Sequence, residues 1–357
     1  MQRFLIFTAI FCLFRISNFA QAPADTAKFL LQKLVSDGHV IGATAGIMTE
    51  GEIAWQSAVG YADEKQGEAF TIATITRTAS IAKSMTAIAV MQLYEQSLID
   101  LDVPIQTYLP DFPKKPEGDI TVRQLLAHTS GIKNYKNAKE IENQTHYPTL
   151  TAAVDVFKDR ELNFKPGESF SYASYNYVVL GLIIERVSGT TFENYMQKNI
   201  WAKAGMTNTS VEKLDENVPN KSLLYHKSKR GKIKQAKPND LSNRVPGGGF
   251  QTTLGDMLHF GNAVIENKLI KASTLELMTQ IHSLEKEGNP YGFGWFLYGP
   301  KPDENLVIGH SGEQTGAATQ LMIIPKNKTV IVVFANTSRS WQEIVGLSVE
   351  LTRLFKR

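Results

Sequence analysis

Ser80 and Lys83 are the residues of this 357-residue chain whose types and spacing most directly suggest chemistry. They form a Ser-x-x-Lys motif, and residues three apart on a helix share one face, so the amine can reach the hydroxyl. A serine hydroxyl is a weak nucleophile unless a base lies beside it. A serine in the first helical turn also lies near the partial positive charge of the helix N-terminus. The pair therefore suggests a nucleophilic serine with a lysine partner.

The motif alone is weak, because the same pattern also begins at Ser130, Ser210 and Ser283. Those three serines lie in polar or charged stretches, whereas Ser80 opens a long, largely apolar segment. Apolar residues recur there at helical spacing, which predicts one apolar helix face: Ala82, Met85, Ala89 and Leu93. A serine that opens a helix is most often only an N-cap. The rest of the sequence must therefore decide its role.

The elements that would position this helix follow a simple order along the chain. Strand-like segments at 43–49 and 52–59 meet at Glu50-Gly51, which predicts a β-hairpin. Helical periodicity then predicts helices over residues 122–127, 150–158, 177–187, 192–204 and 254–266. Strands return at 294–297, 306–309, 319–324 and 330–335, and a last helix is expected over about 341–355.

This order predicts an α/β (α+β) fold in which both ends of the chain build one domain. An antiparallel sheet would be flanked by helices from both chain ends, and a mostly helical domain would be inserted between its halves. We expect residues 23–70 and 286–357 to form the discontinuous α/β domain. Residues 71–285 would form the helical domain that carries Ser80. A cleft between two such parts is a common place for an active site.

Seven short motifs in order then give the chain a family resemblance. It resembles the serine β-lactamase and penicillin-binding superfamily, in the branch of class C β-lactamases, D-alanyl-D-alanine carboxypeptidases and related esterases. The resemblance runs from about Gly42 to Asn336 and implies a β-lactamase/transpeptidase-like fold. The motifs are Ile41-Gly42-Ala43, Thr78 to Ser84, Leu125 to Gly131, Pro166 to Tyr172, Gly247 to Phe250, Tyr291 to Trp295 and Gly309 to Gly312.

The resemblance implies a role for each site residue. Ser80 would attack a carbonyl carbon, and Lys83 and Tyr172 would handle the proton as one coupled unit. His310, Ser311 and Gly312 would form the third motif, on the strand that lines the site. The backbone N–H groups of Ser80 and Glu313 would form the oxyanion hole. These roles imply a serine hydrolase that works through an acyl-enzyme without metal or other cofactor.

Two positions depart from the family pattern. Ser174 stands two residues after Tyr172, where the family usually has asparagine, and the spacing favours Ser174 over Asn176 at that position. Serine is shorter than asparagine and lacks the amide pair that orients a substrate's amide group. His310 replaces the lysine of a dedicated β-lactamase. The expected substrate is a D-amino-acid peptide, an ester or a β-lactam, with the peptidase or esterase branch favoured.

His128 lies in Leu-Leu-Ala-His-Thr-Ser-Gly, at the expected end of a helix. We interpret it as a residue that fixes a turn rather than one that takes part in chemistry. The seven histidines show no close metal-ligand spacing, so a metal mechanism has no support.

The N-terminus has the pattern of a secretory signal peptide over residues 1–22. Arg3 precedes an apolar run from Phe4 to Phe14, which is too short to span a bilayer, and small residues follow at Ala20 and Ala22. We expect a secreted or periplasmic protein with no stable membrane span after cleavage. The single cysteine, Cys12, lies inside this segment, so a disulfide framework or a thiolate nucleophile is excluded for the mature chain.

The charge balance of the mature chain gives no sign of a nucleic-acid partner. Without Arg3 and Arg15 the 38 basic residues become 36, against 35 acidic ones. A local basic stretch over residues 227–237 is interpreted as a solvated surface loop. The expected partner is a small-molecule or short-peptide substrate, and the oligomeric state stays open.

An alternative function is a penicillin-binding or sensor protein of the same fold that turns over very slowly or not at all. Ser174 and the acidic Glu313 favour this alternative, whereas the complete set of Ser80, Lys83, Tyr172 and His310 favours the enzyme.

Overall fold

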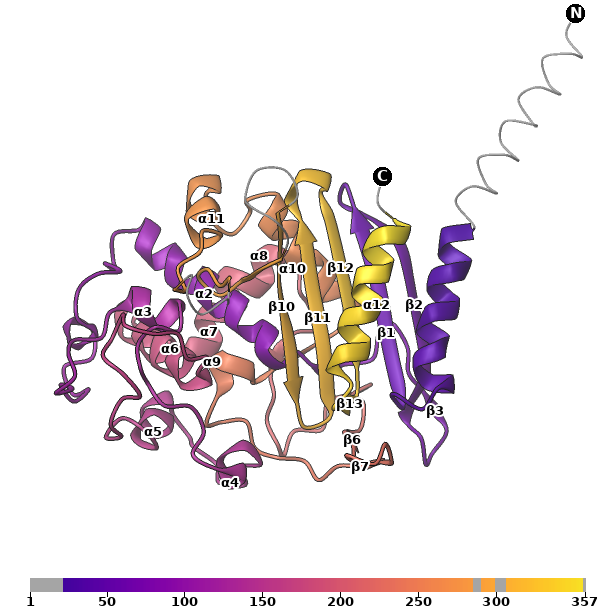
Figure 1. Ribbon diagram of the computed structural model, residues 1–357, viewed down its shortest axis with the longest axis horizontal. Coiled ribbons are helices and arrows are strands. Elements are labelled where there is room, and N and C mark those ends of the chain that lie inside the picture. Colours follow the sequence, from indigo (N-terminus) through magenta and orange to yellow (C-terminus); the bar gives the residue numbers. More distant parts are fainter. Residues whose placement is uncertain (1–21, 285–289, 299–305, 356–357) are drawn as a thin grey trace, which may run out of the picture.

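The chain forms a large antiparallel sheet with helices on both faces (Figure 1). The computed structural model describes residues 22–284, 290–298 and 306–355. In this part of the chain the sheet has the strand order β3-β2-β1-β12-β11-β10-β9. The strands are β1 Gly42–Thr49, β2 Glu52–Asp63, β3 Glu68–Ala69, β9 Phe296–Tyr298, β10 Val307–Gln314, β11 Ala317–Ile324 and β12 Thr329–Ala335. The predicted signal peptide and Cys12 lie outside the described residues.

The two ends of the chain meet in the middle of this sheet. Strand β1 pairs with β12, in a register that places Ala43 opposite Ala335. Glu50 and Gly51 both have positive φ, 53° and 81°, which is the backbone of a two-residue type I′ hairpin turn. The predicted hairpin and the shared sheet are therefore confirmed.

Strand β12 is buried on both faces, and its side chains alternate between two cores. Ile331 and Val333 pack with a helix over residues 22–36 and with α12 (Trp341–Leu354). Val332 and Phe334 face the other way and pack with α10 (Leu254–Ile265) and the helical region. Figure 1 shows the N-terminal helix and α12 on the side of the sheet away from that region. The predicted fold class is confirmed.

A mostly helical region fills the middle of the chain, which also contributes five of the six strands in two small three-stranded sheets. The remaining α-helices are α2 Ala82–Glu95, α3 Val122–Leu126, α4 Ala138–Ile141, α5 Leu150–Asp155, α6 Ser174–Ser188, α7 Phe192–Met196, α8 Ala202–Ala204, α9 Val245–Gly248 and α11 Ala272–Met278. Shorter turns are η1 Ala79–Ile81, η2 Ile105–Thr107, the π-helical η3 Gln197–Trp201 and η5 Pro325–Asn327. The small sheets contain β4 Thr76–Arg77, β5 Ser210–Val211, β6 Tyr225–Lys227, β7 Ile233–Gln235, β8 Phe250–Thr252 and β13 Thr337–Ser338.

Helix α2 differs from its predicted amphipathic form. Every residue from Ala82 to Leu93 is buried, so the helix is enclosed on all sides rather than on one face. Gln92 is accommodated because its Nε2 donates to the backbone oxygens of Asn199 and Leu269, at 3.1 and 2.8 Å. Gln92, which interrupts the apolar pattern, is therefore a buried residue that links α2 to two neighbouring backbone segments.

The basic stretch at 227–237 is not simply a loop, because strands β6 and β7 pair as a hairpin there. Most of its basic side chains are exposed, as expected: Lys229, Arg230, Lys232, Lys234 and Lys237.

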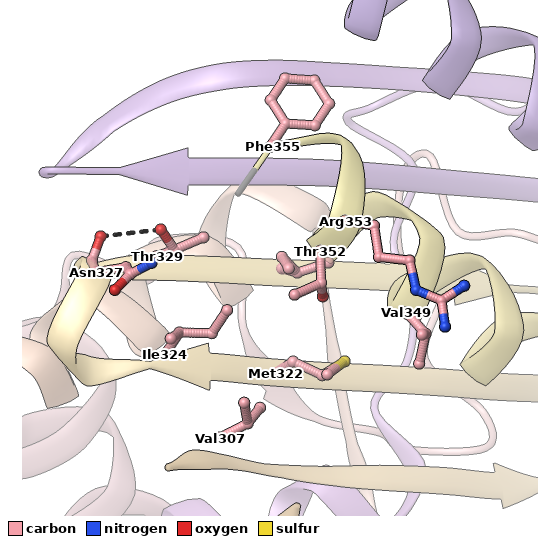
Figure 2. A pocket seen from close by; sticks show the side chains of 10 residues that line it. Val307, Met322, Ile324, Asn327, Thr329, Val349, Thr352, Arg353 and Phe355 are labelled. Carbon is pink, nitrogen blue, oxygen red and sulfur yellow. Dashed lines mark hydrogen bonds between the residues drawn. The ribbon is translucent and has the colours of Figure 1, made fainter. Parts of the chain in front are cut away.

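A cavity of about 240 Å³ lies on the α12 side of the large sheet (Figure 2). Its lining is mainly apolar and, as Figure 2 shows, includes Met322 and Ile324 of β11, Val349 of α12 and Phe355 directly after that helix. No helix among the described residues has both the length and the apolar character needed to cross a bilayer.

Candidate active site

Ser80 lies in the turn η1, directly before α2 and against strand β10. Ala79 before it has a φ of 47°, in the left-handed region that L-residues rarely adopt. A Cβ atom added to Gly312 of β10 would lie 2.7 Å from Ala79 Cβ and 2.8 Å from Ser80 N. Only glycine therefore allows β10 to approach the Ser80 turn this closely.

Lys83 is fully buried and points back to Ser80. Its Nζ atom lies 3.1 Å from Ser80 Oγ, 3.2 Å from Ser174 Oγ and 2.6 Å from the backbone oxygen of Gly247. Burial, and then the positive charge of Arg244, lower the pKa of Lys83 from 10.5 to about 7. A substantial fraction of the amine is thus neutral at neutral pH.

Tyr172 lies next to both Ser80 and Lys83. Lys83 Nζ lies 4.9 Å from the centre of the Tyr172 ring. Burial raises the pKa of Tyr172 well above 10, although a hydrogen bond with Ser80 acts in the opposite direction. The phenol is therefore neutral at neutral pH and carries a proton that it can donate.

Ser174, rather than Asn176, faces this cluster. Ser174 is the first residue of α6 and its hydroxyl contacts Lys83. The Asn176 side chain instead bonds to Ser130 Oγ at 2.7 Å and to His128 Nδ1 at 3.2 Å. The position chosen from spacing is the one that the geometry brings to the lysine.

His310 on β10 is buried and uncharged. Its Nδ1 lies 2.6 Å from the backbone oxygen of Ser311, and its Nε2 lies 3.1 Å from Tyr291 Oη. Since the carbonyl can only accept, Nδ1 carries the proton and Nε2 accepts from the tyrosine. Burial and the nearby Lys83 lower the pKa of His310 to about 3. The position that holds a lysine in the pattern of dedicated β-lactamases thus has no positive charge here.

The end of β10 carries the other residues expected in the third motif. Ser311 is half-buried and pairs with Gln320 of β11, and Gly312 is buried beside Ser80. The Glu313 side chain is exposed, and its Oε1 accepts a hydrogen bond from Arg339 N at 2.7 Å.

Several neighbours of the cluster were not assigned a role from the sequence. Gly247 O binds Lys83, and a side chain on Gly247 would lie 3.0 Å from the backbone oxygen of Ser174. The Gly247 to Phe250 motif signalled this approach. Arg244 gave no such signal, because one arginine in a polar stretch has no distinguishing pattern.

The other Ser-x-x-Lys serines have structural contacts. Ser130 bonds to Asn176, and Ser210 accepts a hydrogen bond from Gln251 Nε2 at 3.0 Å. Within the described ranges, no group of three or more His, Cys, Asp or Glu side chains is placed to hold a metal ion.

An antiparallel sheet from both chain ends, with a Ser-x-x-Lys turn from the helical region packed against its β10 strand, defines a β-lactamase/transpeptidase-type serine hydrolase fold. The chain belongs to the Beta-lactamase family, whose model matches residues 27–346.

Comparison with known proteins gives the same grouping. The human serine beta-lactamase-like protein LACTB, mitochondrial, is 27% identical over 86% of this chain and 73% of its own length. An octameric penicillin-binding protein homologue from Pyrococcus abyssi has a TM-score of 0.80 at 26% identity, covering 92% of this chain and 76% of that one. A D-stereospecific amidohydrolase from Streptomyces sp. has a TM-score of 0.76 at 26% identity, covering 91% and 98%.

Proposed function

We propose that this protein hydrolyses an amide or ester through an acyl-enzyme on Ser80. The observation that carries the proposal is the contact between Ser80 Oγ and a buried lysine whose pKa lies near 7. A neutral amine at 3.1 Å is within the range for a general base. Tyr172, which forms a hydrogen bond with Ser80, completes the set as the proton donor.

The reaction proceeds in two halves. Ser80 Oγ bonds to the substrate carbonyl carbon while its proton passes to Lys83, and the oxyanion accepts hydrogen bonds from the backbone N–H groups of Ser80 and Glu313. The carbon–leaving group bond then breaks, and the leaving group takes a proton from Lys83 through Tyr172. Water attacks the ester, gives its proton to Lys83, and the acid leaves as Ser80 regains its hydrogen.

Lys83 is better suited than Tyr172 to accept the first proton. Ionising Tyr172 at neutral pH requires overcoming a pKa raised above 10, whereas the pKa of Lys83 has already been lowered to about 7. Tyr172 therefore acts as a proton donor and relay in this proposal.

The charge pattern favours esters and amides without a carboxylate next to the reacting carbonyl. His310 is neutral and committed to Tyr291 and Ser311, so it offers no cation to a carboxylate. The exposed carboxylate of Glu313 at the end of β10 further disfavours a negative charge. Among the substrate classes expected for this fold, we place esters and D-amino-acid amides before D-alanyl peptides and β-lactams.

Intact-protein mass spectrometry tests the nucleophile. The mature chain and the Ser80→Ala variant are each mixed with benzylpenicillin, with an activated ester and with a D-amino-acid amide. We expect ester or amide turnover, and any penicilloyl adduct, on the wild type alone. Unchanged hydrolysis by a folded Ser80→Ala variant would refute the proposal.

The same experiment separates the enzyme from the alternative of a binding or sensor protein. Ser174 and Glu313 are the residues that favour that alternative. A stable adduct on Ser80 without turnover of any substrate would support it. Repeated turnover with return of the unmodified mass would exclude it.

We also propose that the chain is exported and loses residues 1–22, on the pattern of Arg3 and the apolar run that follows. N-terminal sequencing of the protein recovered from outside the cytoplasm tests this. An intact Met1 in the native host would contradict it.

A further inference from the structure

His128 contacts the segment that carries Tyr172 on both sides of that residue. The backbone oxygen of His128 accepts a hydrogen bond from Ser171 N at 2.9 Å. The side-chain Nδ1 accepts one from Ala173 N at 3.2 Å. The rings of His128 and Tyr172 are 4.3 Å apart between their centres. One residue thus holds the N–H groups directly before and after Tyr172 and also packs on its ring.

The hydrogen bonds around His128 fix its tautomer. Ser130 Oγ donates to Asn176 Oδ1 at 2.7 Å, so the amide nitrogen of Asn176 is the atom that faces His128 Nδ1, at 3.2 Å. Ala173 N–H can also only donate. Since Nδ1 accepts from both, it carries a lone pair, and the proton of the neutral imidazole is on Nε2.

The surroundings of His128 keep it in this neutral form. The side chain is fully buried, and its Nε2 has no hydrogen-bond partner among the residues that the structure describes. Burial, and then the positive charge of Lys83, holds the pKa of His128 well below its ordinary value. A protonated ring would lose the acceptor that binds Ala173 N–H.

The backbone of His128 is also held in a specific conformation. Its φ of 59° lies in the left-handed region, directly after α3 and Ala127. Such a conformation is strained in a residue other than glycine and persists where the surroundings determine it. The next residue, Thr129, also contacts the segment that leads to Tyr172. Its backbone oxygen accepts a hydrogen bond from Gly167 N at 2.8 Å.

We propose that His128 is the positioning residue of Tyr172, holding the phenol at Ser80 through its backbone oxygen and its neutral Nδ1. The inference rests on the proposed function, in which Tyr172 passes a proton at Ser80. His128 itself touches neither substrate nor the transferred proton. Its effect on the reaction passes through Tyr172, and this sets it apart from a residue that only stabilises the fold.

Two substitutions of His128 test whether its Nδ1 acts as the hydrogen-bond acceptor for Ala173 N–H. Asparagine places an oxygen near the position of Nδ1 and tolerates positive φ, whereas leucine has nearly the same shape and no acceptor. With p-nitrophenyl acetate as the probe, we expect His128→Leu to lower kcat about 100-fold, since a small misplacement of a reacting group can have that effect. KM should change less than about threefold, because no substrate contact is lost. His128→Asn should stay within about tenfold of the wild type.

A double-mutant cycle with Tyr172→Phe provides the decisive readout. If His128 acts through Tyr172, then His128→Leu has little further effect on kcat once the phenol oxygen is gone. A full additional loss in the Tyr172→Phe background, with both proteins folded by thermal melting, would overturn the inference. Should His128→Leu not fold, the cycle is run with His128→Gln, whose amide oxygen lies one bond too far to replace Nδ1.

Ser80→Ala, measured beside these variants, keeps the two proposals distinguishable. If Ser80→Ala still turns over the ester, the proposed function fails and the inference falls with it. If Ser80→Ala is inactive while the effects of His128→Leu and Tyr172→Phe multiply, only the role of His128 is refuted. Exposed His146, changed to Gln, serves as the control histidine and should leave kcat unchanged.

Discussion

At the scale of single residues, the proposed chemistry depends most on the protonation state of Lys83. Its contacts are a hydroxyl on each of Ser80 and Ser174 and the backbone oxygen of Gly247, all of them neutral groups. An amine enclosed in this way gives up its charge more easily than one paired with a carboxylate. The spacing of Ser80 and Lys83 predicted their contact, but spacing contains no information on burial, which sets the protonation state.

The pKa of Lys83 predicts how the rate depends on pH. The amine must be neutral to accept the Ser80 proton, and its pKa of about 7 makes the neutral fraction rise as pH increases through that value. We expect kcat/KM to rise about tenfold per pH unit below about pH 7 and to level off above it. A stopped-flow profile with an uncharged ester measures this. A profile that stays flat between pH 5 and 8 would contradict it, and Lys83→Arg should be inactive because arginine keeps its charge.

The position of Arg244 near Lys83 leads to a second prediction for the pH–rate profile. Its guanidinium donates to the backbone oxygens of Glu140 and Ile141 and lies 4.7 Å from the centre of the Tyr135 ring, and none of these partners is charged. Its positive charge lowers the pKa of Lys83. Arg244→Gln should therefore move the midpoint of the profile to higher pH, while Arg244→Lys should leave it in place. An unmoved midpoint in a folded Arg244→Gln variant would show that burial alone sets the pKa.

Strand β10 is the element that brings the sheet to the nucleophile. It continues to Gln314, beyond the strand predicted at residues 306–309, because its polar and glycine residues still pair with β11. Strand periodicity is weak in this stretch, since Gly309 and Gly312 have no side chains to show which face is buried. The family motif marked the segment, but the sequence pattern did not reveal it as a strand.

The close packing around Gly312 predicts that adding a single methyl group there will disturb the active site. Gly312→Ala places Cβ within 3 Å of both Ala79 and Ser80, so β10 or the Ser80 turn has to move. We expect kcat/KM to fall about 100-fold, because the nucleophile and the oxyanion donors lose their alignment. Steady-state kinetics with an ester measure this.

Gly346→Ala is the matched control for that substitution. Gly346 lies inside α12, and nothing lies within 4 Å of an added Cβ. The variant should keep full activity and gain about 0.5–1 kcal/mol in helix stability. Equal activity in the two variants would show that the close approach at Gly312 is not needed.

Most longer elements could be predicted, and the misses have physical causes. The predicted helix at 192–204 is present, with a π-helical turn at Gln197–Trp201 that helical spacing does not distinguish. The pieces β4, β5 and β8 have only two or three residues each, too few to show a period. The helix at 22–36 adjoins the predicted signal peptide and was not identified. The predicted domain boundaries at 70/71 and 285/286 stay a prediction.

At the scale of the whole molecule, Arg77 joins parts that are distant in sequence. It is fully buried and bonds to both oxygens of Glu212, at 2.8 and 2.7 Å, to Asn239 Oδ1 at 2.7 Å and to the backbone oxygen of Thr315 at 2.7 Å. Thr315 directly follows β10, whereas the other two partners belong to the inserted region. The hydrogen bond to Thr315 therefore ties the inserted region to the sheet beside the site, and the ion pair with Glu212 holds the guanidinium that donates it.

Removing the charge of Glu212 should weaken that connection. Glu212→Gln leaves the guanidinium of Arg77 buried without its counter-charge, so we expect the free energy of unfolding to fall by about 3 kcal/mol. Urea denaturation measures this. Glu50→Gln is the control, because its pair with Lys328 is exposed, and its loss should leave the free energy of unfolding nearly unchanged. Equal stability of the two variants would contradict the prediction.

The pairing of β1 with β12 has a consequence for how the chain acquires activity during its synthesis. Ala43 finds its partner only when Ala335 has emerged, so the centre of the sheet is among the last contacts to form. Helix α2 and its serine can be translated long before β10 exists to support them. A nascent or truncated chain therefore has no complete site, and we expect activity to arise late and all at once, after the two ends of the polypeptide have met.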